Sequence, residues 1–397
     1  LFPGERIESV SKKGNVLESF KTATGSVFQG LAFIDCSYEG DLMALSGVSY
    51  TWGREGESKY NESLAGRLPV PNNHGDHQFY VTVDPYDKDH KLLPLVYGGN
   101  TTVFHDGDKK VQSYNFRMCF SSDKSNQVPF EKPEGYDEKD WELLTRYLIA
   151  ENNKTTIHDL MILSELPNNK FDINNHGPIS TDYINHAWEY PEASWTRKLE
   201  IYDEHVKYTQ GFFYFLANSP NSPENVRESM KGLGLAKDEF VDTNNWPFQL
   251  YVREARRMIG TYIMTQHDRT DTIHKDDSIG VGSYNIDTHH CQRFPQGDGV
   301  INEGDIEAHF SNTFELPYSC ITPRDSEATN LLVPVCVSAS HIGYGPIRLE
   351  PQYMILGQSA GVAAAMAIKS GSTVQQVNIK ELQNRLLELG QILVAEK

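Results

Sequence analysis

Three histidines in the last third of the chain stand where a side chain could move a proton. His289 and His290 follow Asp287 in a stretch rich in His, Asp and Gly, and His341 lies in a glycine-rich stretch farther along. Histidine changes its charge near neutral pH, so it is the commonest general base. The commoner role of a single polar histidine is a loop residue hydrogen-bonded to backbone, and this reading stands beside the catalytic one.

Two arginines are candidates to hold an anionic group or a polar ring. Arg253 and Arg348 carry a fixed positive charge and a planar set of donors that suits such a ligand. Arg253 stands beside Glu254 in a run that also contains Arg256 and Arg257, a pattern that fits a structural ion pair equally well.

A second group of candidates lies near the start of the chain. The apolar run 31–35 is typical of a buried strand, and it ends in Asp35. Glu39, Gly40 and Asp41 follow, immediately before an apolar helix predicted over 42–45. Ligands of α/β sheets lie where a strand ends at a helix N-terminus, so we predict that these four residues bind a cofactor. The alternative is that the acids cap the helix, and the same residues can have both roles.

The hydrophobic pattern predicts the elements that must position these residues. Turn residues divide 5–35 into short strands, and 276–294 has no sustained period, which favours a functional loop region. The C-terminal helix is rich in Gly and Ala, and we expect Gly357 and Gly361 to let it pack closely on a sheet. The predicted helices span 141–151, 190–216, 225–233, 250–265, 352–369 and 381–393, and further strands 79–83, 111–120 and 330–337.

Composition excludes several classes of partner. There are 36 Lys and Arg against 54 Asp and Glu, a net charge of −18. We therefore expect no nucleic acid and no anionic membrane surface as a partner, whereas a small neutral molecule such as a sugar is compatible. No stretch has the length and apolarity of a membrane span. The 5 cysteines include no CxxC pair, so we expect no metal site.

Four blocks of sequence, in order along the chain, resemble the FAD-dependent oxidoreductase family. Some members of that family carry the label "xanthan lyase". The first block includes residues 33–44, 47–48, 53–55 and 61–66; the second is 250–260; the third includes 277–280 and 284–289; the fourth includes 330–334, 338–341, 348–351 and 354–361.

The resemblance implies an α/β fold with a glutathione-reductase-like FAD/NAD(P)-binding domain that is incomplete in this chain. We assign 1–67 and 321–397 to that domain and 68–320 to an inserted α+β substrate or cap domain. The resemblance also implies that the helix after Arg348 points its N-terminus at FAD, where free N–H groups stabilise the reduced flavin. A plain buried helix is the alternative. The cofactor-binding residues that it implies in this region are Ser340, His341, Arg348, Glu350, Pro351 and Gly357.

The family resemblance also predicts an N-terminal βαβ unit with a G-x-G-x-x-G loop, and this chain, which starts at Leu1, shows none. Gly280 and Gly282 match two positions of the motif, but Asn285 stands at the third and no strand–turn–helix context surrounds them. We therefore expect a partner chain, or an N-terminal segment that this sequence lacks, to complete the FAD site.

These observations predict hydride transfer from a small polar substrate to FAD, with a carbohydrate-type substrate favoured. The catalytic candidates are His289, His290, His341 and Arg253. The alternatives are a non-catalytic remnant or half of an assembly, which would stay without flavin in excess FAD, and a polysaccharide lyase, which would release unsaturated product without flavin.

Overall fold

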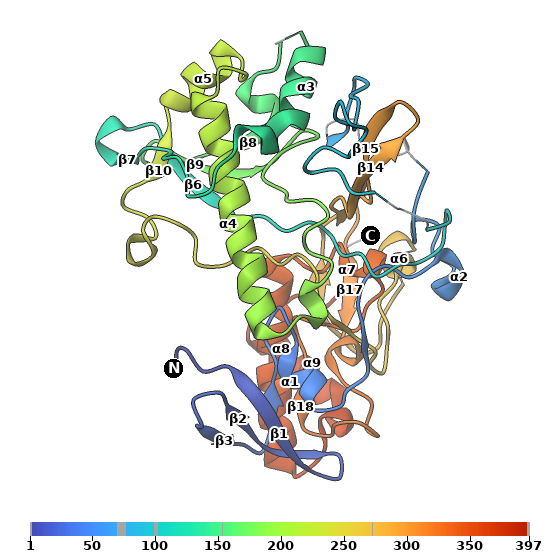
Figure 1. The fold of residues 1–397 in the computed structure, drawn as a ribbon. Helices are drawn as coiled ribbons and strands as arrows, with labels where there is room; N and C mark the ends of the chain where they lie inside the picture. The colour runs from blue at the N-terminus through green and yellow to red at the C-terminus, as the bar shows by residue number, and fades with distance from the viewer. Residues whose placement is uncertain (1, 70–76, 99–101, 153, 272, 395–397) are drawn as a thin grey trace.

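The computed structural model describes residues 2–69, 77–98, 102–152, 154–271 and 273–394, and it confirms a mixed α/β protein. Figure 1 shows two regions. The N-terminal strands lie beside the C-terminal helices in one of them, and the middle of the chain forms the other. No described helix is long and apolar enough to cross a membrane.

The first region is built around helix α8 (Glu350–Ser370). Pro351 stands in its first turn, and Gly371 ends it in the left-handed conformation that glycine adopts without strain. Ala360, Ala363, Ala364 and Ala367 share one buried face. The other elements are the meander β1 (Ile7–Lys13), β2 (Val16–Thr22) and β3 (Val27–Gln29), the parallel pair β4 (Phe33–Ile34) and β18 (Leu331–Leu332), and helices α1 (Asp41–Leu45) and α9 (Ile379–Glu388).

The expectation that Gly357 and Gly361 pack closely on a sheet is wrong for the described part of the chain. A Cβ atom added at either glycine would meet nothing within 4 Å. The reason is helical geometry, because the alanine face is the one turned towards the core and these glycines lie outside it.

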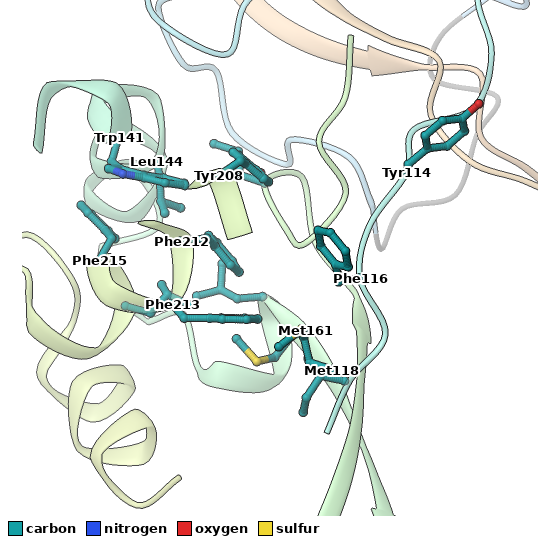
Figure 2. Close-up of a cluster of buried hydrophobic side chains, with 14 of the residues drawn as sticks. Tyr114, Phe116, Met118, Trp141, Leu144, Met161, Tyr208, Phe212, Phe213 and Phe215 are labelled. Carbon is teal, nitrogen blue, oxygen red and sulfur yellow. The ribbon is translucent and has the colours of Figure 1, made fainter. Parts of the chain in front are cut away.

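The second region is an antiparallel sheet covered by helices. Its strand order is β7-β10-β6-β9-β8, and the long helix α4 packs its aromatic residues together with Trp141, as Figure 2 shows for Phe212, Phe213 and Phe215. The elements are β6 (Met118–Ser121), β7 (Gln127–Val128), β8 (Met161–Leu166), β9 (Lys170–Asn175), β10 (Gly234–Ala236), α3 (Glu142–Ala150), α4 (Trp195–Asn218) and α5 (Glu224–Lys231). The apolar spacing of the sequence predicted helices α3, α4 and α5.

Short strand pairs make up much of the remaining structure. Much of 276–294 is extended, which corrects the prediction of a loop there: its polar residues alternate along strands too short to show a period. The pairs are β5 (Tyr50–Thr51) with β11 (Arg257–Met258), β12 (Ser278–Gly282) with β17 (Phe314–Pro317), β13 (Ile286–Thr288) with β16 (Ile306–Ala308), and β14 (Gln292–Gln296) with β15 (Gly299–Glu303); the helices are α2 (Glu57–Tyr60), α6 (Gln266–Thr270) and α7 (His341–Tyr344).

The helix predicted over 250–265 is wrong. The segment is irregular except for the two-residue strand β11, and its backbone N–H groups bond to three separate parts of the chain: Tyr251 to Asn115, Met258 to Cys336 and Ile259 to Ser49. Long-range pairing thus overrides helix propensity, which is a weak preference.

Three smaller predictions are also decided. Residues 79–83 form no strand, and only Leu331–Leu332 of 330–337 does. Gly280 and Gly282 lie on β12, outside any strand–turn–helix unit, which confirms that they are not the dinucleotide motif.

The two regions have separate hydrophobic cores. The core around α8 includes Ile279 and Phe314. The core of the second region includes buried residues between Val83 and Ala255, together with Val300.

Candidate active site

His289 lies between β13 and β14, where its ring meets a buried carboxylate. Nδ1 of His289 is 2.8 Å from Oδ2 of Asp182. The side chain of Asp182 is 4 % exposed and that of His289 is 15 % exposed. An ionised carboxylate holds the proton on Nδ1 and leaves Nε2 as the basic atom. Burial, reinforced by the charge of Arg253, lowers the pKa of His289 to about 4, so the ring is neutral at pH 7.

Asp182 is held in its ionised form by its own partners. Nη1 of Arg253 is 2.9 Å from Oδ1 of Asp182, and Ser113 Oγ donates to Oδ2 at 3.0 Å. Burial by itself raises the pKa of Asp182, but the charge of Arg253 and the hydrogen bonds from His289 and Ser113 outweigh it and lower the pKa below its ordinary value. The buried Arg253 is therefore a positioning residue that fixes the partner of His289.

Arg348 and Asp287 lie on the other side of His289. Together with Asp182 and Arg253 they form a cluster around its ring. Nη2 of Arg348 is 3.2 Å from Oδ1 of Asp287, and the same oxygen is 3.6 Å from Nε2 of His289. Burial works against the charge of Arg348, but Asp287 outweighs it and raises the pKa of the guanidinium. Tyr284, which is partly exposed, hydrogen-bonds to Asp287. The Nε2 side of His289 thus faces the carboxylate of Asp287.

His341 joins this cluster through a buried chain of polar groups. Its Nδ1 is 2.8 Å from Oε2 of Glu254, and Gln112 donates from Nε2 to the same Glu254 oxygen at 2.7 Å. Gln112 Oε1 in turn accepts the backbone N–H of His289 at 3.0 Å. Nε2 of His341 has no hydrogen-bond partner among the described residues.

His290 is not part of this arrangement. Its ring points the other way, and Nε2 donates to the backbone carbonyl of His77 at 3.0 Å. Neighbouring residues of an extended chain point to opposite sides, which separates the two histidines. Of the four predicted catalytic residues, the structure brings together His289, His341 and Arg253.

A groove of about 440 Å³ lies beside the cluster, between the two regions. Its lining reaches the cluster through Tyr251, whose ring lies 5.2 Å from the guanidinium carbon of Arg253. Glu350, the first residue of α8, also lines the groove. Leu349, which precedes the helix, supplies no side-chain cap. The residues that line the groove include Tyr38, Arg117, Asp172, Phe240, Phe248 and Tyr251.

The predicted acids after β4 are engaged in the fold. Asp35 accepts from the Ser37 backbone N–H and hydroxyl and from the Met43 backbone N–H, which caps α1. Glu39 accepts from the Tyr190 hydroxyl at 2.9 Å, and Asp41 is 2.8 Å from Nη1 of Arg256. Capping and pairing therefore account for these acids, and their contact with a cofactor stays a prediction.

Two other predicted residues have structural roles. Gly40 has a φ of 66°, and an added Cβ would lie 2.9 Å from Met43 Cε, so this turn requires glycine. Ser340 Oγ caps α7 through the Gly343 N–H at 2.9 Å and donates to Glu62 at 2.5 Å. Pro351 and Gly357 lie on α8 as predicted, and no contact bears on their cofactor role.

Sequence reasoning missed Asp182. It lies far from His289 in sequence and in no recognisable motif, so only the tertiary structure reveals the pairing. Among the described residues, no group of three or more His, Cys, Asp or Glu is arranged to hold a metal ion.

Comparison with known proteins identifies the family. The family model described as FAD dependent oxidoreductase matches residues 1–386. Neither the curated proteins nor the solved structures gave a significant match. Because that family model covers nearly the whole chain, this protein belongs to the FAD-dependent oxidoreductase family.

Proposed function

We propose that this protein oxidises a C–H bond next to oxygen or nitrogen in a small polar substrate, with a carbohydrate-type substrate favoured, and that His289 is the base. The family supports a general oxidoreductase function. The observation that carries the assignment of the base is the 2.8 Å contact between His289 Nδ1 and the buried Asp182. FAD, when bound, supplies the acceptor for the hydride.

The residues around the groove fit the ring end of FAD. Leu349 supplies no side-chain cap to α8, so the N–H groups of Glu350 and Gln352 can meet an electron-rich group, whereas Pro351 has no N–H. Tyr38 and Tyr251 offer aromatic surface in the same groove. We infer that Tyr38 and the start of α8 hold the ring at one end of the groove and leave the end with Phe248 to the substrate.

The same groove does not suit the pyrophosphate of FAD. Its charged side chains are Arg117, which is paired with Asp172, and Glu350. Anionic phosphates need free cations or a cluster of N–H groups. We therefore infer that the phosphate contacts come from outside this groove, from a partner chain or a further segment. This is consistent with a glutathione-reductase-like FAD domain that holds the inserted cap domain.

The protein's own residues then divide the work of proton transfer. Asp182 keeps the proton of the neutral imidazole on Nδ1, and Nε2 of His289 takes the hydroxyl proton of the substrate as the C–H bond breaks. Arg253 keeps Asp182 ionised, and Arg348 holds Asp287 beside the open edge of the ring. The charge that His289 gains is stabilised by both carboxylates.

A second candidate function is half of an assembly that binds FAD only with a partner. The observation that favours it is the outer face of α8, where a Cβ added at Gly357 or Gly361 would meet no described atom within 4 Å and where Met354 is exposed. A segment packed there would cover this face. A polysaccharide lyase, the third alternative, gains no support from the site.

The test compares two neighbouring histidines. The purified chain, loaded with FAD, is mixed anaerobically with neutral sugars, and the loss of visible flavin absorbance is followed. His289→Gln is expected to slow this reduction by about 10²–10⁴-fold, whereas His290→Gln, outside the cluster, leaves the rate unchanged. Equal rates in both variants would refute the role of His289. A protein that stays colourless in excess FAD would refute oxidation by this chain alone and favour the assembly.

A further inference from the structure

We propose that the end of the groove that contains Phe248 is a saccharide subsite, beside the place proposed for the FAD ring, and that the ring of Phe248 is its stacking platform. This inference rests on the proposed oxidation for the identity of the reacting carbon. The subsite itself rests on the shape and chemistry of the groove, whose 440 Å³ lies within the range of small-molecule sites, about 300–1,000 Å³.

Phe248 presents an apolar ring in an unusual setting. It is 69 % exposed, yet it stands in the wall of a groove that also contains Tyr38, Tyr251 and Phe240. An exposed aromatic ring in a concave site leaves apolar area in contact with water, and a ligand with its own apolar face can cover that area. Pyranose rings have such a face, formed by their axial C–H groups.

The segment that carries Phe248 is held in a strained and fixed conformation. Phe240, Asn244 and Asn245 have φ values of 49°, 57° and 64°, in the left-handed region. For a bulky residue such as Phe240 this is a genuine outlier, and strain of this kind concentrates at functional sites. Nδ2 of Asn245 donates to the carbonyls of Lys237 at 2.7 Å and Glu239 at 2.9 Å. The platform is therefore preorganised, which lowers the cost of binding.

The polar side chains of the groove match hydroxyl groups. Arg117 and Asp172 form a paired guanidinium and carboxylate, and Gln249 and Glu350 add an amide and a second carboxylate. Hydroxyls both donate and accept, so this mixture can satisfy a sugar rim. With one cation against two carboxylates, the groove repels phosphates and carboxylates. A neutral polyol ring is the ligand class that fits both the aromatic wall and this charge.

The subsite also leads to the proposed base. Tyr251 lines the groove, and the guanidinium carbon of Arg253 lies 5.2 Å from its ring centroid. Arg253 pairs with Asp182, which in turn holds His289. A saccharide stacked on Phe248 would therefore extend towards the cluster, so that the groove selects the substrate while His289 acts on it.

Calorimetric titration of the full chain with cellobiose, maltose and lactose tests this proposal without any turnover. At least one disaccharide is expected to give saturable binding. Phe248→Ala should weaken it about fivefold, the equivalent of about 1 kcal/mol for a lost stacking contact, and Phe248→Trp should retain it. Phe2→Ala is the matched control, because Phe2 is 71 % exposed and does not line the groove; its affinity should be unchanged.

The outcomes separate this inference from the proposed function. Absence of binding for all three sugars, or equal affinities for Phe248→Ala and Phe2→Ala, would overturn the subsite and leave the role of His289 intact. Binding that depends on Phe248, in a protein whose flavin no sugar reduces, would support the subsite and refute the oxidation.

Discussion

Replacing Asp182 by Asn removes one charge from the centre of the cluster while it preserves the size of the side chain. Arg253, whose side chain is 1 % exposed, would lose its carboxylate partner at 2.9 Å. Removing one member of a buried ion pair costs about 3–5 kcal/mol of folding free energy, because the other charge stays buried and uncompensated. An amide still offers one hydrogen-bond acceptor, so we expect a loss near the lower end, about 3 kcal/mol.

The same substitution should affect catalysis through His289. Without the carboxylate, the proton on Nδ1 is no longer favoured, and a histidine with the proton on Nε2 cannot act as the base. The corresponding change in a Ser–His–Asp triad lowers kcat by about 10⁴-fold, which sets the upper limit here. Flavin reduction per folded, FAD-loaded molecule measures this effect, and urea unfolding followed by tryptophan fluorescence measures the stability.

Two further variants make the reasoning refutable. Asp182→Asn combined with Arg253→Met removes both charges and should regain at least half of the lost stability, since no buried charge remains unpaired. If Asp182→Asn alone does not fold, Ser113→Ala removes only the 3.0 Å hydrogen bond to Asp182 and should cost about 1 kcal/mol. A stable Asp182→Asn protein with an unchanged rate of flavin reduction would show that the pairing has neither role.

Further predictions concern pH and backbone conformation. The pKa of His289 lies at about 4 in the folded protein against an ordinary value of 6.5, so the unfolded chain binds the proton first. Stability should therefore fall as pH drops from about 6.5 to 4, by up to about 3 kcal/mol for this residue, and His289→Gln should lose less over the same range in urea unfolding. Gly40→Ala should destabilise by about 1–3 kcal/mol, because φ is 66° and the new Cβ would approach Met43 and Cys336. Gly357→Ala, in open space on α8, should be neutral or stabilise by up to about 1 kcal/mol in thermal unfolding; a similar loss in both variants would refute the distinction.

Local patterns predicted the regular elements well where one helix or strand is long enough to show its own period. Helices α3, α4, α5, α8 and α9 agree with the apolar spacing of their segments. The prediction of secondary structure failed where a segment shows a local pattern but makes its contacts with residues far away in the sequence. Arg253, Arg256 and Arg257 stand at the i, i+3 and i+4 spacing of a helix face. In the structure they reach carboxylates in distant segments instead, as Arg256 reaches Glu192 and Asp41.

The sequence by itself determined the family, the mixed α/β class and the residue types available for chemistry, because these depend on motifs and on composition. Only the tertiary structure decided which candidates meet. His289 and His290 are adjacent and chemically identical in the sequence, yet one contacts Asp182 and the other a backbone carbonyl. Asp182, the partner that makes His289 a candidate base, carries no signal of its own in the chain. The physical reason is that the pKa and tautomer of a histidine depend on charges and burial supplied by residues far away in sequence, and folding alone brings those together.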